Sequence, residues 1–237
     1  MAIVIATATE REMRAAFGFM AEPPAVEPGR PVDFELTGWR LKLVVTGVGL
    51  LNASLALGRL AGEGGLAGVV NLGVAGSFDT RALDLREPFL VRREVWPEFG
   101  LLGEAGLDPR GLGFGLGEAG GQDVWDTLDL APRQDAARMG IELPRGWPEA
   151  VSLSVSGVTG TPERAAMLAK TFDADVENME GFALAFGCAR LGLPFLELRT
   201  VSNLVGSRRA EDWDLDGALD VLGPITAGLF MGREPLR

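Results

Sequence analysis

Four short segments place carboxylates, amides, hydroxyls and glycines directly after predicted strands. In an α/β sheet the binding site forms at the carboxyl ends of the strands, so these segments are the first candidates for chemistry. Each also has a purely structural interpretation. Glu12 and Glu180 are typical of solvated charges at a helix start, and Asn203 is typical of a capping residue. Gly73 and Gly76 fit turns. The four segments are residues 6–12, 71–78, 176–181 and 199–206.

The chain contains no histidine, which restricts the chemistry available to it. Without an imidazole there is no Ser-His-Asp or Cys-His nucleophile, no His-Glu-x-x-His zinc motif and no histidine acid or base. The two lysines, Lys42 and Lys170, do not end a phosphate-binding Gly-x-x-x-x-Gly-Lys loop. Catalysis must therefore rest on carboxylates, amides and hydroxyls, and we expect no metal site and no cofactor.

Composition predicts an acidic protein without a nucleic-acid partner. With 22 basic and 33 acidic residues the formal net charge is −11, which disfavours binding to nucleic acid. No apolar stretch reaches membrane-spanning length, so we expect no membrane partner. A single cysteine, Cys188, and a start without a basic segment favour a cytoplasmic protein with no secretory signal. The 237 residues are expected to form one domain, residues 1–237.

Strand and helix patterns alternate along the chain. A buried strand at residues 2–6 leads through the cap residues 7–9 into a helix at about 10–17. Thr161 as the cap and Pro162 at the first position open a later helix. We therefore expect an α/β fold, a single three-layer domain with a central mixed, mainly parallel twisted sheet flanked by helices. Other strands are expected at residues 41–46, 68–72, 89–95, 151–157, near 175 and at 195–201, and other helices near 52–62, 180–191 and 213–230.

The middle of the chain breaks this pattern. Nine glycines lie between residues 97 and 124, and further breakers lie between 132 and 148. Such a composition predicts long loops with one short helix. Loops of this length within a compact domain are typical of lids or interfaces.

Five motifs resemble, in order and spacing, the nucleoside phosphorylase superfamily. The likeness is strongest to its branch of methylthioadenosine/S-adenosylhomocysteine nucleosidases and futalosine hydrolases, and it covers most of the chain except the glycine-rich middle. The motifs are Ala8-Thr-Glu-Arg-Glu12, Gly47-Val-Gly49, Asn71-Leu-Gly-Val-Ala-Gly76, Glu177-Asn-Met-Glu-Gly181 and Arg199-Thr-Val-Ser-Asn203.

The resemblance implies a role for each motif in cleaving a ribosyl bond. Glu12 would activate the attacking water, and Asn203 would meet the departing base. Such a reaction passes through an oxocarbenium-like state, which carboxylates and a hydrogen-bond donor suit. Glu10 is the competing candidate for the base. The residues implied to bind the substrate are Val74, Ala75, Gly76, Asn178, Met179, Glu180 and Ser202.

Three positions depart from related enzymes. The adenine-specific nucleosidases carry an aspartic acid where this chain has Asn203, and an amide suits a 6-oxopurine better, because it can both donate and accept a hydrogen bond. Phosphorolytic relatives carry a phosphate-binding arginine where this chain has Asn71, which favours water over phosphate. A serine that contacts ribose in the adenine-specific enzymes is replaced by Val74.

The leading hypothesis is hydrolysis of futalosine to hypoxanthine and dehypoxanthine futalosine in menaquinone biosynthesis. One alternative is an adenine-releasing nucleosidase, against which Asn203 argues. A second, from another class, is a dinucleotide-binding oxidoreductase or sensor, with Gly47-x-Gly-x-x-Asn52 as a degenerate fingerprint and Glu63 as the ribose acid. A third is an inactive ligand-binding relative.

The resemblance also implies a homo-oligomer, because family members use a neighbouring subunit to close the pocket. The substrate partner is expected to be a small purine nucleoside. Candidates for contacting its far end are residues 96–100 and the pair Arg208-Arg209.

Overall fold

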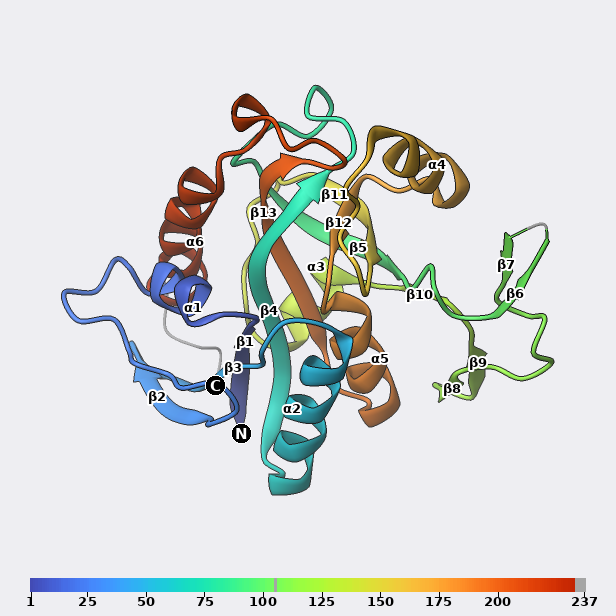
Figure 1. Ribbon diagram of the computed structural model, residues 1–237. Helices are drawn as coiled ribbons and strands as arrows, with labels where there is room; N and C mark the ends of the chain where they lie inside the picture. Colours follow the sequence, from blue (N-terminus) through green and yellow to red (C-terminus); the bar gives the residue numbers. More distant parts are fainter. Residues whose placement is uncertain (105, 233–237) are drawn as a thin grey trace.

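The computed structural model describes residues 1–104 and 106–232, and its main sheet has nine strands with helices on both faces (Figure 1). The strands of this sheet are β1 (Ala2–Thr7), β2 (Val32–Leu36), β3 (Trp39–Val45), β4 (Leu66–Ser77), β5 (Pro88–Val95), β10 (Thr127–Asp129), β11 (Glu149–Ser154), β12 (Val176–Asn178) and β13 (Phe195–Leu204). The helices are α1 (Glu10–Ala16), α2 (Leu50–Glu63), α3 (Pro132–Arg138), α4 (Pro162–Phe172), α5 (Gly181–Leu191) and α6 (Leu215–Phe230), with a 3₁₀ turn at Ala210–Asp212.

Side-chain alternation along β1 explains the layers. Ile3 and Ile5 belong to the hydrophobic cluster that also holds buried residues of α1 and α6, whereas Val4 and Ala6 belong to the cluster beneath α2 and α5. Successive side chains of a strand point to opposite faces, so the sheet is covered on both sides. Figure 1 shows these two helix pairs on opposite sides of β4. The predicted three-layer α/β fold is confirmed.

The sheet is mixed, and its pairing brings the predicted site segments together. β4 pairs in parallel with β1 and β13 and antiparallel with β12. In this register Gly76 lies opposite both Glu177 and Asn203. β13 also pairs with β5, and β5 with β11, which pairs with β12, so five strands close into a ring. Because Ala6 on β1 also lies opposite Asn71, all four predicted site segments adjoin at β4.

The strand expected at residues 68–72 is longer than predicted, because β4 continues to Ser77. Gly73 and Gly76 are therefore not turn glycines. Both allow close packing: a Cβ on Gly73 would lie 2.6 Å from Glu12 Oε1, and one on Gly76 would lie 2.7 Å from Val205 Cγ2. Likewise, β13 includes Asn203, so these two site segments lie on their strands and do not follow them.

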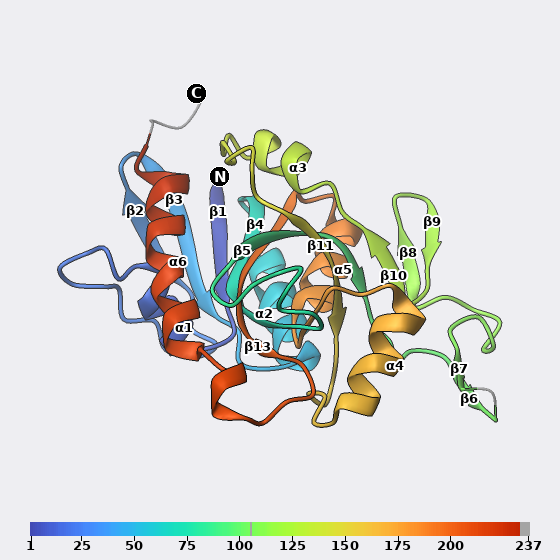
Figure 2. The ribbon, with the colours of Figure 1, turned by 90° about the horizontal axis from the view of Figure 1, so that it is seen from above.

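The glycine-rich middle contains the one predicted short helix, α3, and also structure that the sequence did not predict. Two hairpins, β6–β7 (Leu101–Gly103 and Gly106–Asp108) and β8–β9 (Gly117–Ala119 and Gln122–Val124), project from the sheet in both Figures 1 and 2. Edge strands β2 and β10 were also missed. Within the described residues, no helix is both long enough and apolar enough to span a membrane.

Candidate active site

Arg199, on β13, connects the residues predicted to form the site. Its side chain is buried, and its Nη1 donates to Val74 O at 2.9 Å while its Nη2 lies 3.5 Å from Glu180 Oε2. Burial alone would lower the pKa of this guanidinium, but the neighbouring carboxylates of Glu197 and Glu180 outweigh that effect and raise it. Arg199 is therefore a fixed positive charge at the centre of a carboxylate cluster.

The role of Arg199 was not predicted from the sequence, although its motif resembles that of the related enzymes. A signal was present in the sequence, because an arginine in the apolar run of β13 follows Glu197 by two residues and so lies on the same strand face. Buried charges of this kind are retained only when they are paired.

Glu12 reaches the cluster from the first turn of α1. Its Oε2 accepts hydrogen bonds from the backbone N–H and the hydroxyl of Thr9, each at 2.9 Å, in a capping box. Its Oε1 accepts from Val74 N at 3.1 Å. Burial raises the pKa of Glu12, Arg199 opposes the rise, and Glu180 adds to it. Glu10, the competing candidate for the base, is exposed to solvent on the outer side of the same turn.

Glu180 lies where β12 passes into α5, and a tight glycine turn holds it. The N–H of Gly49 donates to Glu180 Oε1 at 2.9 Å. Gly49 has a φ of 94°, a conformation that a side chain at this position would strain. Because Arg199 faces the other carboxylate oxygen, Glu180 is held from both sides and does not swing freely.

The same turn overturns the dinucleotide interpretation. Gly49 N–H donates to a carboxylate, Glu180, and Gly47 N–H donates to Ala8 O, whereas a dinucleotide fingerprint would present such groups to phosphate. Glu63, the proposed ribose acid, is the last residue of α2, and a helix of that length places it about 20 Å from the turn. Glu63 instead lies near Lys42 and Arg59, at 3.7 and 3.8 Å.

Asn178 lies beneath Glu180, and its side chain is already fully engaged. Its Oδ1 accepts from the backbone N–H groups of Glu180 and Gly181, both at 2.8 Å, and its Nδ2 donates to Ser152 and Glu94. The side chain therefore orients the start of α5 and leaves no N–H for a ligand. Met179, next along, is half-buried against the cluster around Leu153.

Asn203 presents an open donor at the end of β13. The hydroxyl of Ser202 donates to Asn203 Oδ1 at 2.8 Å and to Ala75 O at 3.2 Å, which ties the amide to β4. Among the residues that the structure describes, none accepts a hydrogen bond from Asn203 Nδ2, which lies over Gly76. The half-buried amide is thus oriented with its N–H groups free for a ligand.

A cavity of about 590 Å³ opens beside the Gly49 turn. Its walls come from the start of α2, from α5 and from Trp96, and the ring centroids of Trp96 and Phe182 lie 6.0 Å apart. Of the two candidates for the far end of a ligand, Trp96 lines this cavity, whereas Arg208 stacks on Trp213 and Arg209 pairs with Glu211.

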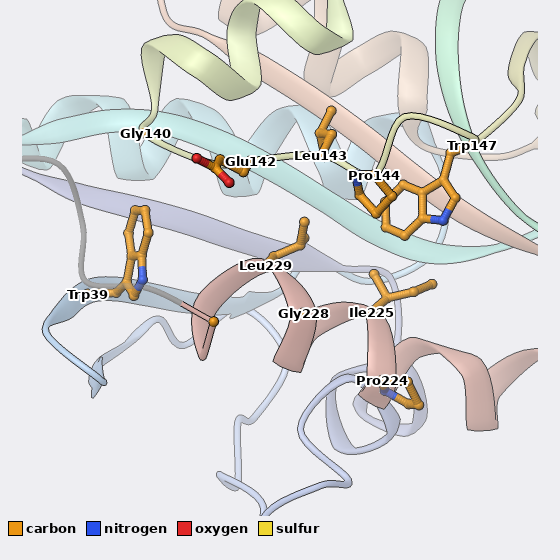
Figure 3. Close-up of a pocket in the computed structure, with 11 residues that line it drawn as sticks. Trp39, Gly140, Glu142, Leu143, Pro144, Trp147, Pro224, Ile225, Gly228 and Leu229 are labelled. Atoms are coloured by element: carbon orange, nitrogen blue, oxygen red, sulfur yellow. The ribbon is translucent and has the colours of Figure 1, made fainter.

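A second cavity of about 440 Å³ shares no lining residue with the carboxylate cluster. Figure 3 shows it between α6 and the loop after α3, with Trp39 and Trp147 among its walls. The residues that converge on Arg199 place the candidate active site elsewhere, beside the Gly49 turn.

Comparison with known proteins finds relatives that cover most of the chain. A family described as the phosphorylase superfamily matches residues 126–223. Futalosine hydrolase of Thermus thermophilus is 35% identical over 207 residues, 85% of this chain and 87% of the relative. Futalosine hydrolase of Streptomyces coelicolor is 32% identical and covers 94% and 92%. The solved structure of a futalosine hydrolase mutant of Helicobacter pylori shares the fold, with a TM-score of 0.70, 18% identity and coverage of 96% and 97%.

Proposed function

Because the chain belongs to the futalosine hydrolase family, we propose that it hydrolyses the N-glycosidic bond of futalosine, releasing hypoxanthine and leaving dehypoxanthine futalosine for menaquinone biosynthesis. The observation that carries the proposal is the convergence of Glu12 and Glu180 on one buried arginine, beside an amide with a free donor.

In the proposed mechanism each carboxylate has its own task. Glu12, buried and held by Thr9 and Val74, takes the proton of the attacking water. Glu180 binds ribose hydroxyls and stabilises the positive charge that develops on the sugar. Asn178 does not touch the substrate but keeps Glu180 in place.

The purine binds over the end of β4 in this proposal. Val74, Ala75 and Gly76 form the backbone floor, and Ser202 fixes the amide of Asn203. Asn203 Nδ2 donates to the departing 6-oxopurine, and its Oδ1 retains a lone pair for a ring N–H. A neutral amide stabilises the leaving base by hydrogen bonding and does not protonate it.

The remaining part of futalosine, an aromatic carboxylate, is proposed to enter the 590 Å³ cavity. Phe182 and Phe186 stack with their centroids 6.2 Å apart, and Trp96 adjoins them. Met179, at the side of Glu180, lies between the ribose and this end of the substrate in the proposed binding mode.

A cytoplasmic homo-oligomer is also part of the proposal. Leu51 and Leu55 of α2 are 87% and 75% exposed beside the cavity, and Leu102 and Phe114 are exposed on the middle segment. Leu51 and Leu55 lie one helical turn apart, and exposed apolar side chains beside a binding cavity are typical of an interface. Sedimentation velocity checks the assembly, and a monomer at micromolar concentration would contradict it.

The substrate assignment is tested by incubating the protein separately with futalosine, inosine and methylthioadenosine and identifying the released base. We expect hypoxanthine from futalosine at the highest kcat/KM. Preferential release of adenine from methylthioadenosine would contradict the proposal.

A further inference from the structure

Two carboxyl groups that the mechanism does not use lie completely buried behind the site. Glu94 is on β5 and Glu197 is on β13, and neither has solvent exposure. Both face Gly181, the first residue of α5. A Cβ on Gly181 would lie 2.4 Å from Glu94 Oε1 and 2.5 Å from each oxygen of Glu197. The two carboxyls therefore adjoin in a space that only a glycine leaves open.

The hydrogen bonds around this pair are incomplete by one proton. Both oxygens of Glu94 accept a bond, from Asn178 Nδ2 and Ser154 Oγ, each at 2.7 Å. Glu197 Oε1 accepts from Arg199 Nε at 2.6 Å and from Asn71 Nδ2 at 3.2 Å. Glu197 Oε2 has no partner among the described residues. A buried acceptor left unpaired costs free energy, and so do two adjacent buried negative charges.

One proton on Glu94 removes both costs, because a protonated Glu94 donates to Glu197 Oε2. Burial and the charge of Glu197 raise the pKa of Glu94 well above its ordinary value. Burial also raises the pKa of Glu197, but Arg199 opposes that rise. Glu94 is thus the neutral partner and Glu197 the charged one.

The pair is connected to the site through Arg199. Glu197 holds Arg199 Nε from behind, while the other end of the guanidinium faces Glu180 and its field reaches Glu12. The charged groups that act on Glu12 in the described residues are Arg199 and Glu180, and Glu197 is the carboxylate that neutralises Arg199 from the far side.

We propose that Glu94 and Glu197 form a carboxyl–carboxylate pair that shares one proton, fixes Arg199 from behind, and limits how strongly Arg199 favours the charged form of Glu12. Both are positioning residues, since neither touches the proposed substrate. This inference rests on the proposed function for its kinetic test, because that test follows Glu12 as the base.

The negative charge that each variant leaves on the pair distinguishes a shared proton from two ionised or two protonated carboxyls. Glu94→Gln keeps one negative charge in the pair, so the acidic limb of the pH profile of kcat/KM on futalosine should stay in place, whatever happens to the rate. The double variant Glu94→Gln/Glu197→Gln removes that charge. Glu12 and Glu180 are then the carboxylates that remain to neutralise Arg199. The acidic limb should then move to lower pH, by about one unit or more. A limb that moves in Glu94→Gln, or stays in the double variant, would overturn the proposal.

A second measurement needs neither activity nor the double variant. Infrared difference spectra between wild type and Glu94→Gln at neutral pH should show the loss of one C=O band of a protonated carboxyl group. Absence of that band from the wild type would overturn the shared proton even if futalosine is cleaved. Conversely, if the protein shows the band but does not cleave futalosine, the proposed function is refuted and the shared proton is not.

Discussion

At the scale of single residues, burial and pairing decide which carboxylate can act as a base. Glu10 and Glu12 both occupy the first turn of α1, and the sequence favoured Glu12 as the base with Glu10 as the competing candidate. Only Glu12 turns inward, where Thr9 and Val74 hold it next to Arg199. Glu10 stays in water. The raised pKa of Glu12 strengthens it as a proton acceptor once it is ionised.

Glu12→Gln should lower kcat on futalosine by about 100- to 10,000-fold, because it removes the base but keeps the size of the side chain. Substrate affinity and the far-ultraviolet circular dichroism should be almost unchanged. Glu10→Gln is the matched control and should keep wild-type turnover. The base assignment would be wrong if the two variants behaved the other way round.

Asn203→Asp should reverse the preference for the base. An ionised carboxylate facing the 6-oxo group loses the donor and repels the carbonyl oxygen, whereas a protonated one serves an adenine. Loss of a matched polar contact can change discrimination by up to about 10,000-fold. The measured quantity is the ratio of kcat/KM for hypoxanthine and adenine nucleosides at matched pH. An unchanged ratio in a folded variant would show that Asn203 does not recognise the base.

At the scale of elements, the sequence predicted the type and order of the helices and strands more accurately than the residues at which they begin and end. α4 was predicted from Thr161 and Pro162, and the Thr161 hydroxyl does accept from Arg164 N. The strand that corresponds to β4 was predicted to end at Leu72, because glycines usually end a strand. Its glycines instead admit side chains from other elements, a tertiary contact that no local pattern encodes.

The other misses have different causes. In β2, Val32, Phe34 and Leu36 alternate with Asp33 and Glu35, so the strand pattern was present in the sequence and was overlooked. The hairpins β6–β7 and β8–β9 are largely exposed, so no apolar periodicity marks them. At the site, the motifs located Glu12, Glu180 and Asn203, but the pairing of Arg199 with Glu197 became evident only from the folded chain.

Gly73→Ala tests the close-packing role of β4. The added Cβ would lie 2.6 Å from Glu12 Oε1 and 3.2 Å from Arg199 Nη1, so the base must shift. We expect kcat/KM to fall at least about 10-fold, since small displacements of catalytic groups cost up to about 100-fold. Gly228→Ala, on an exposed and open position of α6, is the control and should retain activity. Equal activity of both variants would contradict the packing argument.

At the scale of the whole molecule, the buried acids make stability depend on pH. Glu12, Glu94 and Glu197 all have raised pKa values in the folded chain, so the native state binds more protons than the unfolded state above the ordinary carboxyl range. Stability is then fullest below that range and declines as pH rises. The net charge of −11 acts in the same direction through self-repulsion.

The free energy of unfolding should therefore fall as the pH rises above the ordinary carboxyl range, by up to about 1.4 kcal/mol per pH unit for each proton retained. Urea denaturation at several pH values measures this slope. Glu94→Gln should show a shallower slope than wild type, because one buried proton no longer depends on pH. Identical slopes would mean that Glu94 is already ionised in the folded protein.

The measurement closest to the central claim compares futalosine cleavage with and without inorganic phosphate, in buffer free of added metal, and identifies the sugar product. If water activated by Glu12 is the nucleophile, hypoxanthine and a sugar with a free anomeric hydroxyl should form at a rate that phosphate does not change. A rate that rises with phosphate, with a sugar 1-phosphate as the product, would contradict hydrolysis.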